Sequence, residues 1–214
     1  MKSITSKKPF DEVKDSLKEF KTLYLIGCGT CATHCKTGGK EEVLAMKQQL
    51  ESLGKKVTGW MVIPTACDEL TKYAIEQETK SIKKADALLV LTCAFGVQTV
   101  CNHTKKPVLP ALDTLFVGKE DEEGALVELC QQCGQCVLGE TAGICPLTTC
   151  HKGLLHGPCG GMDKGKCEID KEKDCAWVLI YKRLEEQGRL HVLEKIQPPK
   201  NYQKVVRPGR MKVE

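Results

Sequence analysis

The sequence predicts an α/β protein in two parts. Residues 1–125 are expected to form a doubly wound, mainly parallel sheet of about four strands, and residues 126–214 a cysteine-rich metal-binding module. The first part alternates short apolar runs with amphipathic segments, as strands and helices do in α/β domains. The second part has little helix or strand pattern before residue 174 and holds eight of the 14 cysteines.

The first half of the α/β part follows from its apolar spacing. A helix is predicted over residues 9–20, where apolar residues recur at helical intervals. A short buried strand is expected at 22–27, a second helix at 40–53 and a second strand at 56–63, which Pro64 ends. These segments make one strand–helix–strand unit behind a leading helix.

The second half repeats the alternation. A helix is predicted from Asp68 to about Lys84, and a third strand at 87–91. That strand, ALLVL, is continuously apolar, which indicates that both of its faces are covered, as in a parallel sheet. A short helix at 97–102 and a fourth strand at 107–111 complete a flavodoxin- or Rossmann-like arrangement.

The second part begins after a polar hinge predicted at residues 120–124 and contains one clear helix, at 175–187. Trp177 and Tyr181 lie one turn apart on it, and a basic tail follows Pro198. Trp, Tyr and Arg are frequent in the energetic centres of protein interfaces. We expect this end to dock on a partner; the alternative is that Trp177 packs inside the module and the tail is solvated. The basic residues of the tail are Lys200, Lys204, Arg207, Arg210 and Lys212.

Composition and charge exclude several classes. A net charge of +4 spread over 214 residues, without a basic stripe, argues against nucleic acid binding. No uncharged stretch is long enough to span a membrane, and the first residues do not resemble a signal peptide. A cytoplasmic protein is therefore expected, whose thiols are ligands or redox groups and not structural disulfides.

The second part carries the strongest metal-binding pattern. Cys130, Cys133 and Cys136 form a C-x2-C-x2-C run, and a Cys-Pro pair follows at Cys145. This resembles the bacterial ferredoxin pattern, except that eight residues and not three separate the last two cysteines. Metal or iron–sulfur ligation is favoured over disulfides and over packed free thiols. We predict that the three thiols bind one centre together with Cys145 or Cys175.

A second centre, a cubane cluster or tetrahedral zinc, is expected from the cysteines that remain. His151 and His156 are weaker candidates for zinc ligands in the same segment. The cysteines available to this centre are Cys145, Cys150, Cys159, Cys167 and Cys175.

The other six cysteines follow the predicted strands of the α/β part, where open α/β sheets bind ligands. A further metal centre is therefore predicted from thiols on three loops that must converge, and a cubane needs four of them. The ligands we expect are Cys28, Cys31, Cys67 and Cys93, with Cys35 and Cys101 in reserve. If Cys35 and Cys101 are not ligands, we expect them to pack as small buried hydrophobic residues.

A weaker pattern overlaps these cysteines. Residues 27–32, GCGTCA, fit a dinucleotide-binding G-x-G-x-x-A fingerprint after a strand. That fingerprint needs an acidic residue near the end of the second strand, where this chain has Ile63-Pro64-Thr65 and reaches an acid only at Asp68. His34 and His103 are candidate ligands as well, but a histidine in a loop is more often solvated, and we expect that here.

Several segments resemble one family. They are CGTCATHCKTGG at 28–39, CQQCGQC at 130–136, TAGICPLTTCHKGLLHGPCGG at 141–161, GKCEID at 165–170 and DCAWVLIYKRLEEQG at 174–188. From about Leu23 to Leu190 the chain resembles the MetV-type proteins, also described as a methylenetetrahydrofolate reductase C-terminal-domain family. The resemblance implies a small subunit with one or two [4Fe-4S] clusters and zinc.

The resemblance also implies a partner, a flavin-bearing MetF-type methylenetetrahydrofolate reductase subunit that makes methyl-tetrahydrofolate. FMN is expected in that partner only, no catalytic residue is expected here, and further electron-transfer subunits belong to the same expectation. The chain would relay electrons to the flavin or support its partner. The alternatives are a zinc-bearing methyl-transfer protein and a structural zinc module without a redox role.

Overall fold

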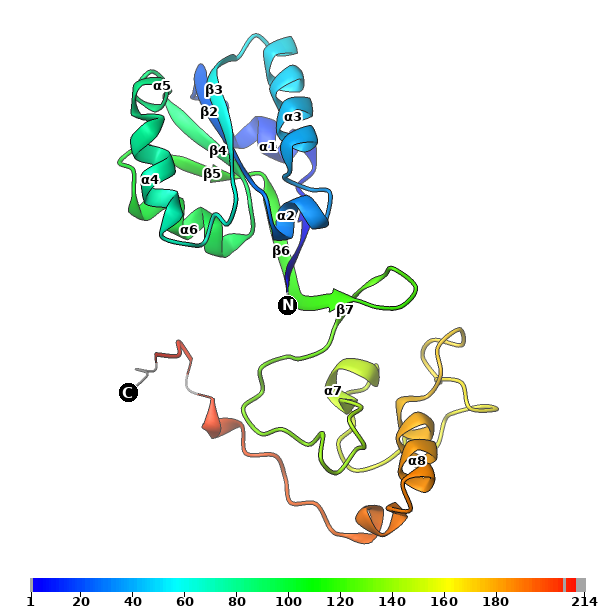
Figure 1. Ribbon diagram of the computed structural model, residues 1–214. Helices are drawn as coiled ribbons and strands as arrows, with labels where there is room; N and C mark the ends of the chain where they lie inside the picture. The colour runs from blue at the N-terminus through cyan, green and yellow to red at the C-terminus, as the bar shows by residue number, and fades with distance from the viewer. Residues whose placement is uncertain (1, 206, 211–214) are drawn as a thin grey trace. The chain divides into compact units, whose positions relative to one another are not determined.

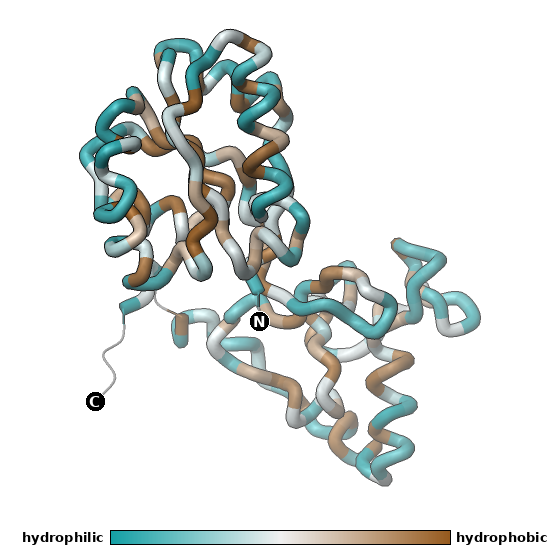
Figure 2. The backbone as a smooth tube through the Cα atoms, turned by 45° about the horizontal axis from the view of Figure 1, so that its top comes forward, coloured by the Kyte–Doolittle hydropathy of each residue, from teal (hydrophilic) through white to brown (hydrophobic). Residues whose placement is uncertain are grey.

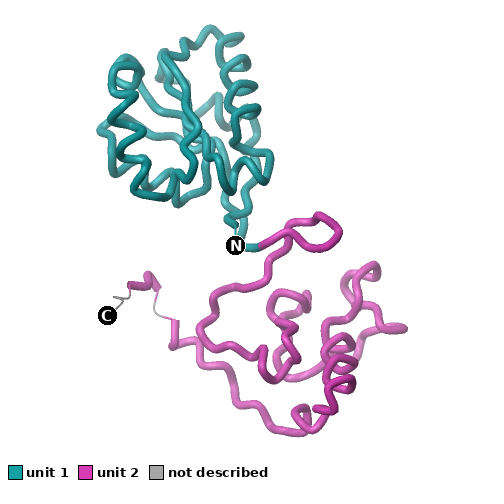
Figure 3. The backbone as a smooth tube through the Cα atoms, viewed as in Figure 1, with its two compact units in different colours: residues 1–118 teal, residues 119–214 magenta. Residues whose placement is uncertain are grey.

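The computed structural model describes residues 2–205 and 207–210 and divides the chain into two compact units. Figure 3 shows them as residues 1–118 and 119–214. The boundary predicted from the sequence, after residue 125, lies a few residues further along the chain. Within the described residues, no helix is long and apolar enough to cross a membrane.

The first unit is built on a four-stranded parallel sheet, which confirms the predicted fold class (Figure 1). Its strands are β2 (Thr22–Cys28), β3 (Lys56–Ile63), β4 (Ala87–Leu91) and β5 (Val108–Pro110), in the order β3-β2-β4-β5. Leu25 of β2 lies opposite Trp60 of β3 on one side and Leu89 of β4 on the other. The central strand is thus paired along both edges.

Helices cover both faces of this sheet. In Figure 1, α1 to α3 lie on one side and α4 to α6 on the other, as right-handed crossovers require when the strand order reverses after β3. The helices are α1 (Phe10–Ser16), α2 (Cys31–His34), α3 (Lys40–Ser52), α4 (Leu70–Gln77), α5 (Thr79–Lys83) and α6 (Ala94–Asn102). The helix predicted from 68 to 84 is therefore two helices, which meet at Glu78.

The core of the first unit lies between sheet and helices. Every residue of β4 is buried, as its continuous apolar run predicts. Leu23, Tyr24 and Leu25 of β2 are fully buried as well. In Figure 2 the strands of this unit carry hydrophobic colours, while polar colours alternate along the helices.

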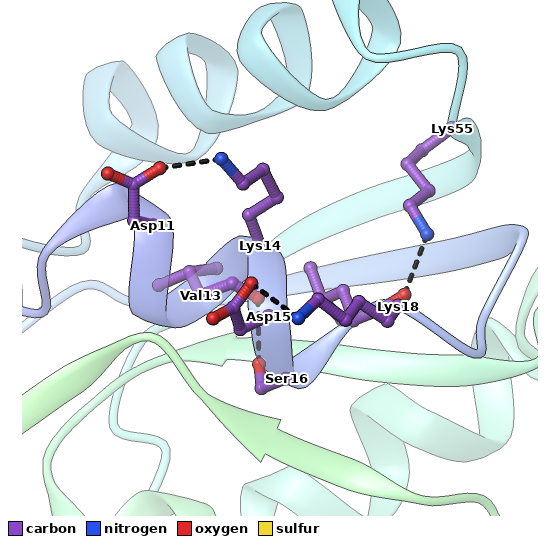
Figure 4. Close-up of polar contacts among 8 residues, drawn as sticks. Asp11, Val13, Lys14, Asp15, Ser16, Lys18 and Lys55 are labelled. Atoms are coloured by element: carbon purple, nitrogen blue, oxygen red, sulfur yellow. Dashed lines mark hydrogen bonds and ion pairs between the residues drawn. The ribbon is translucent and has the colours of Figure 1, made fainter.

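The first helix ends earlier than its apolar spacing predicts, at Ser16 and not at Phe20. Ser16 Oγ donates to the Val13 carbonyl at 2.8 Å, and Lys55 Nζ donates to the carbonyls of Leu17 and Phe20 at 2.6 Å each. Figure 4 shows the lysine reaching the end of α1 from the turn after α3. These bonds satisfy carbonyls left over at a helix end.

Three strands were not predicted. They are β1 (Lys2–Lys7), β6 (Leu112–Glu120) and β7 (Leu126–Glu128), in a sheet of order β1-β6-β7 whose β1–β6 pair is antiparallel. Of residues 120–124, predicted as a hinge, Glu120 ends β6 and residues 121–124 lie in the turn to β7. Asp121 Oδ1 accepts the N–H groups of Glu123 and Ala125 there, at 3.0 and 2.7 Å.

The second unit has little regular structure. Besides β7, its described residues form α7 (Pro146–Thr149), α8 (Ala176–Glu186) and the 3-10 turns Leu190–Glu194 and Tyr202–Lys204. Helix α8 lies where the sequence predicts it. Its buried side packs a small core of Ala142, Cys175, Trp177, Ile180 and Leu184.

The two aromatic residues of α8 do not share an exposed face. Trp177 is buried in the core, and its Nε1 donates to the Leu154 carbonyl at 2.9 Å. Tyr181 is exposed. Trp177 thus packs inside the module, as the alternative had it, because its large ring supplies much of a small core.

Candidate metal centre

Four cysteines lie at the carboxyl end of the parallel sheet. Cys28 is the last residue of β2 and Cys31 the first of α2; Cys67 lies in the turn after β3, and Cys93 lies between β4 and α6. Because β3, β2 and β4 are adjacent and parallel, these connections meet at one edge.

The Cys67 thiol lies within electrostatic reach of the other three. Burial raises the pKa of the Cys67 thiol, and the nearby sulfurs of Cys93, Cys28 and Cys31 raise it further. Cys28 and Cys93 are buried, Cys31 is half-buried and Cys67 is exposed. Ionising several thiols this close together is costly unless a cation shares their charge, which is what a bound metal provides.

Hydrogen bonds hold the cysteine loops of this edge together. Gly29 N donates to the Ile63 carbonyl at 2.8 Å, and Thr30 Oγ1 donates to the Pro64 carbonyl at 2.6 Å. Thr33 Oγ1 donates to the carbonyl of Cys28 at 2.7 Å. The connection after β2 is therefore fixed to the connection after β3, which carries Cys67.

Close packing accounts for the glycines of the dinucleotide-like GCGTCA run. A Cβ on Gly27 would lie 2.5 Å from the Gly38 carbonyl oxygen, and one on Gly29 would lie 3.2 Å from Pro64. Both contacts are within the protein. The glycines let the loop pack against the sheet, and this packing needs no bound nucleotide.

The two reserve cysteines and the two histidines of this unit have other surroundings. Cys35 Sγ lies 3.9 Å from the Ser3 carbonyl oxygen in β1, and Cys101 is exposed on α6. His34 Nε2 lies 2.7 Å from Lys2 Nζ. His103 follows the end of α6. None of the four is among the groups that shift the pKa of Cys67.

The C-x2-C-x2-C loop of the second unit is tightly turned. Gln132 and Gly134 adopt positive φ angles of 51° and 78°. Gln132 N donates to Cys130 Sγ at 3.4 Å, and Gly161 N makes the same contact to Cys159 Sγ at 3.4 Å. Backbone donors two residues beyond a cysteine stabilise its thiolate, the form that binds metals.

Charged side chains lie against two thiols of this unit. Burial alone would raise the pKa of Cys133, but hydrogen bonds from Lys200 and the backbone, with the charge of Lys200, outweigh it and lower this pKa. Cys159 Sγ lies 3.3 Å from Glu168 Oε2, and that carboxylate also forms an ion pair with Lys152.

The remaining cysteines flank short elements. Cys145 precedes α7 and Cys150 follows it, and Cys175 precedes α8. Cys167 N donates to the Lys173 carbonyl at 2.9 Å. The nearby histidines have other neighbours: His151 Nε2 lies 3.7 Å from Asp170 Oδ2, and His156 Nε2 lies 3.5 Å from the Pro198 carbonyl.

The donor chemistry fits thiolate-bound metal, but the sulfurs do not form a closed ligand set. Thiols gather at the sheet edge, and backbone N–H groups point at sulfur in the second unit. Among the described residues, however, no three His, Cys, Asp or Glu side chains are placed to hold one metal ion.

The family comparison bears on the cysteine-rich unit. Residues 109–203 match the family model described as Methylene-tetrahydrofolate reductase C terminal. The matched segment includes all eight cysteines between 130 and 175 and ends within the tail; it excludes the four thiols of the sheet edge. No curated protein and no solved structure matches the chain. The second unit is thus similar to a methylenetetrahydrofolate reductase C-terminal domain.

Sequence reasoning missed the charged neighbours of the thiols. Lys200, which lowers the pKa of Cys133, is far from it in the sequence. Glu168 and Lys152 lie beside Cys159 in the structure, but no sequence pattern marks them as its neighbours. The sequence feature that could have pointed to Lys200 is the basic tail, in which apolar residues do not recur at helix or strand spacing. We expect this tail to dock on a partner; within the chain itself, residues 200–205 and Arg207 contact their own module, and Lys212 lies outside the described residues.

Proposed function

We propose that this chain is a metal-binding subunit of a methylenetetrahydrofolate reductase complex, in which cysteines hold iron–sulfur clusters and zinc. The observation that carries the proposal is the overlap between the family match and the cysteine module. A segment similar to a reductase C-terminal domain would have little need for eight cysteines in a loop-rich unit unless they bind metal.

Three ligand groups follow from the residues. Cys130, Cys133 and Cys136, with Cys145 or Cys175, would hold one centre. The remaining cysteines of the second unit would hold a second one. At the sheet edge, Cys28, Cys31, Cys67 and Cys93 would hold a third. Iron–sulfur clusters exchange single electrons when bound, with potentials set by hydrogen bonds and charge near the sulfurs.

The protein's own residues would place and protect these centres. Backbone N–H groups at Cys130 and Cys159, and the ammonium of Lys200 at Cys133, favour the thiolate form. At the sheet edge, the buried Cys28 and Cys93 keep half of the ligand set away from water. The flavin and the folate would bind in a partner subunit of the reductase type.

The test is reconstitution with a flavin-bearing methylenetetrahydrofolate reductase from the same source. The two chains should elute together in anaerobic gel filtration, and reduction of methylene-tetrahydrofolate by a one-electron donor should require this subunit. Cys133→Ala should lower that rate, whereas Cys101→Ala, which changes an exposed thiol outside the proposed sets, should not.

Two results would count against the proposal. A chain that carries its metals but stays monomeric beside the reductase, with unchanged turnover, is not its subunit. A chain that binds the reductase and contains zinc but no iron or sulfide would instead be a structural or methyl-transfer zinc subunit.

A further inference from the structure

The C-terminal tail lies on the C-x2-C-x2-C loop of its own unit. Lys200 Nζ donates to the Gln135 carbonyl, and Asn201 N donates to Gln135 Oε1 at 2.7 Å. Arg207 Nη2 lies 3.5 Å from the carbonyls of Gln131 and Gln132. We call residues 200–205 together with Arg207 the strap. Its two ends thus bind carbonyls on either side of Cys133, in the loop that carries three cysteines.

Apolar packing joins the strap to the loop between these polar contacts. A Cβ added at Gly134 would overlap the side chain of Val205. Gly134 therefore does two things at once: it allows the positive φ of the turn and leaves room for Val205. Cys133, Tyr202, Val205 and Arg207 line one hollow, so strap and loop also share a surface.

The charge of the strap suits what the loop would hold. Several thiolates around a metal or cluster leave a net negative charge, and groups that do not ligate the metal offset it and fix the ligand loop. Lys200 contacts the Gln135 carbonyl, two residues from Cys133, and Arg207 places a second cation at the Gln131 and Gln132 carbonyls, on the other side of Cys133.

We propose that the strap is part of the metal site, and that Lys200 is a positioning residue that retains the centre bound by Cys130, Cys133 and Cys136. The inference rests on the proposed function, because it assumes that these cysteines bind metal. The inference goes beyond the proposed function because it gives the tail a role within the subunit.

The test is metal release from anaerobically purified full-length protein into excess chelator, followed by absorbance. Lys200→Met removes the charge and keeps the length of the side chain, and we expect release about 10-fold faster, since outer groups of this kind typically change metal affinity 10–100-fold. Lys200→Arg keeps the charge and should release metal at a rate close to wild type. Lys105→Met removes the same charge from the first unit, where Lys105 is exposed, and should change nothing.

A second variant tests the strap without changing charge. Val205→Ser weakens its apolar contact at Gly134 and should also speed release. Equal rates for Lys200→Met, Val205→Ser and wild type would overturn the inference while leaving metal binding intact. Equal acceleration by Lys200→Met and Lys200→Arg would overturn the role assigned to charge. A wild-type chain without metal would overturn the proposed function, and this inference with it.

Discussion

Asp86 joins the starts of two neighbouring strands. Its Oδ2 accepts the backbone N–H groups of Lys21 and Thr22 at 2.9 and 2.8 Å, and its own N–H donates to the Thr22 carbonyl at 2.8 Å. Hydrogen bonds from Thr22 and then Lys21 lower the pKa of this carboxyl. The ionised form is therefore bound more favourably in the folded protein than in the unfolded chain.

The sign of the pH dependence follows from that shift. Because the folded pKa is depressed, the stability that Asp86 contributes is present above its unfolded pKa and is lost as the pH falls through the folded pKa. We predict that Asp86→Asn lowers the Tm of the first unit at neutral pH, and that its difference from wild type closes in acid. Thermal unfolding followed by circular dichroism between pH 7 and pH 3 measures this. A constant difference would show that charge is not involved.

At the scale of single residues, the sequence could place cysteines at the sheet edge but not the charged neighbours of the thiols in the second unit. Cys28, Cys67 and Cys93 could be expected to converge, because each follows a strand of a parallel sheet. Lys200 could not be placed beside Cys133, because its position depends on how an irregular tail folds back over 67 residues of chain. Such long-range contacts leave no periodic signal in the sequence.

Among the elements, the connection from β2 to α3 depends most on close packing. A Cβ on Gly38 would overlap the carbonyl of Leu91 at the end of β4, and the Gly38 carbonyl accepts the N–H of Cys28 at 3.0 Å. Thr37 lies beside it, buried, with its hydroxyl 2.7 Å from that of Thr5 in β1. The loop that carries Cys31 is thus held from three strands.

We therefore predict that Gly38→Ala destabilises the first unit by about 3 kcal/mol or more, because added volume must displace backbone. Gly139→Ala is the matched control: nothing lies within 4 Å of an added Cβ there, and its φ is not in the left-handed region. Urea unfolding of the two variants gives the comparison. If both variants lower the free energy of unfolding equally, the close approach of loop and strand does not limit stability.

The elements that could be predicted are those with strong local signals. Strands β3 and β4 have the predicted bounds because apolar runs end at Pro64 in one case and at polar residues in the other. Strand β1, KSITSK, has few apolar residues, and its structure comes from pairing with β6, more than 100 residues away. Pairing of this kind is set by the folded partner and not by local propensity.

At the scale of the molecule, the two units differ in what can hold them together. The first has a continuous core that includes most of β2 and all of β4. In the described part of the second, the core is a small cluster around α8. Core burial alone is a weak source of stability in a unit of this size, and metal binding contributes folding free energy in such modules.

We predict that metal removal unfolds the second unit and spares the first. In metal-free protein, amides of α8 should exchange with solvent much faster than in the metal-loaded form, while those of β2 and β4 keep their protection. Hydrogen exchange with mass spectrometry resolves the two sets. Equal protection of α8 with and without metal would mean that the small core suffices.

The central claim, that cysteines of this chain bind iron–sulfur clusters and zinc, is tested most directly by quantifying iron, acid-labile sulfide and zinc in anaerobically purified protein. We predict iron and sulfide in equal amounts together with zinc, and the loss of one centre in Cys133→Ala. A well-folded protein that contains neither iron nor zinc, with all thiols free to react, would contradict the account.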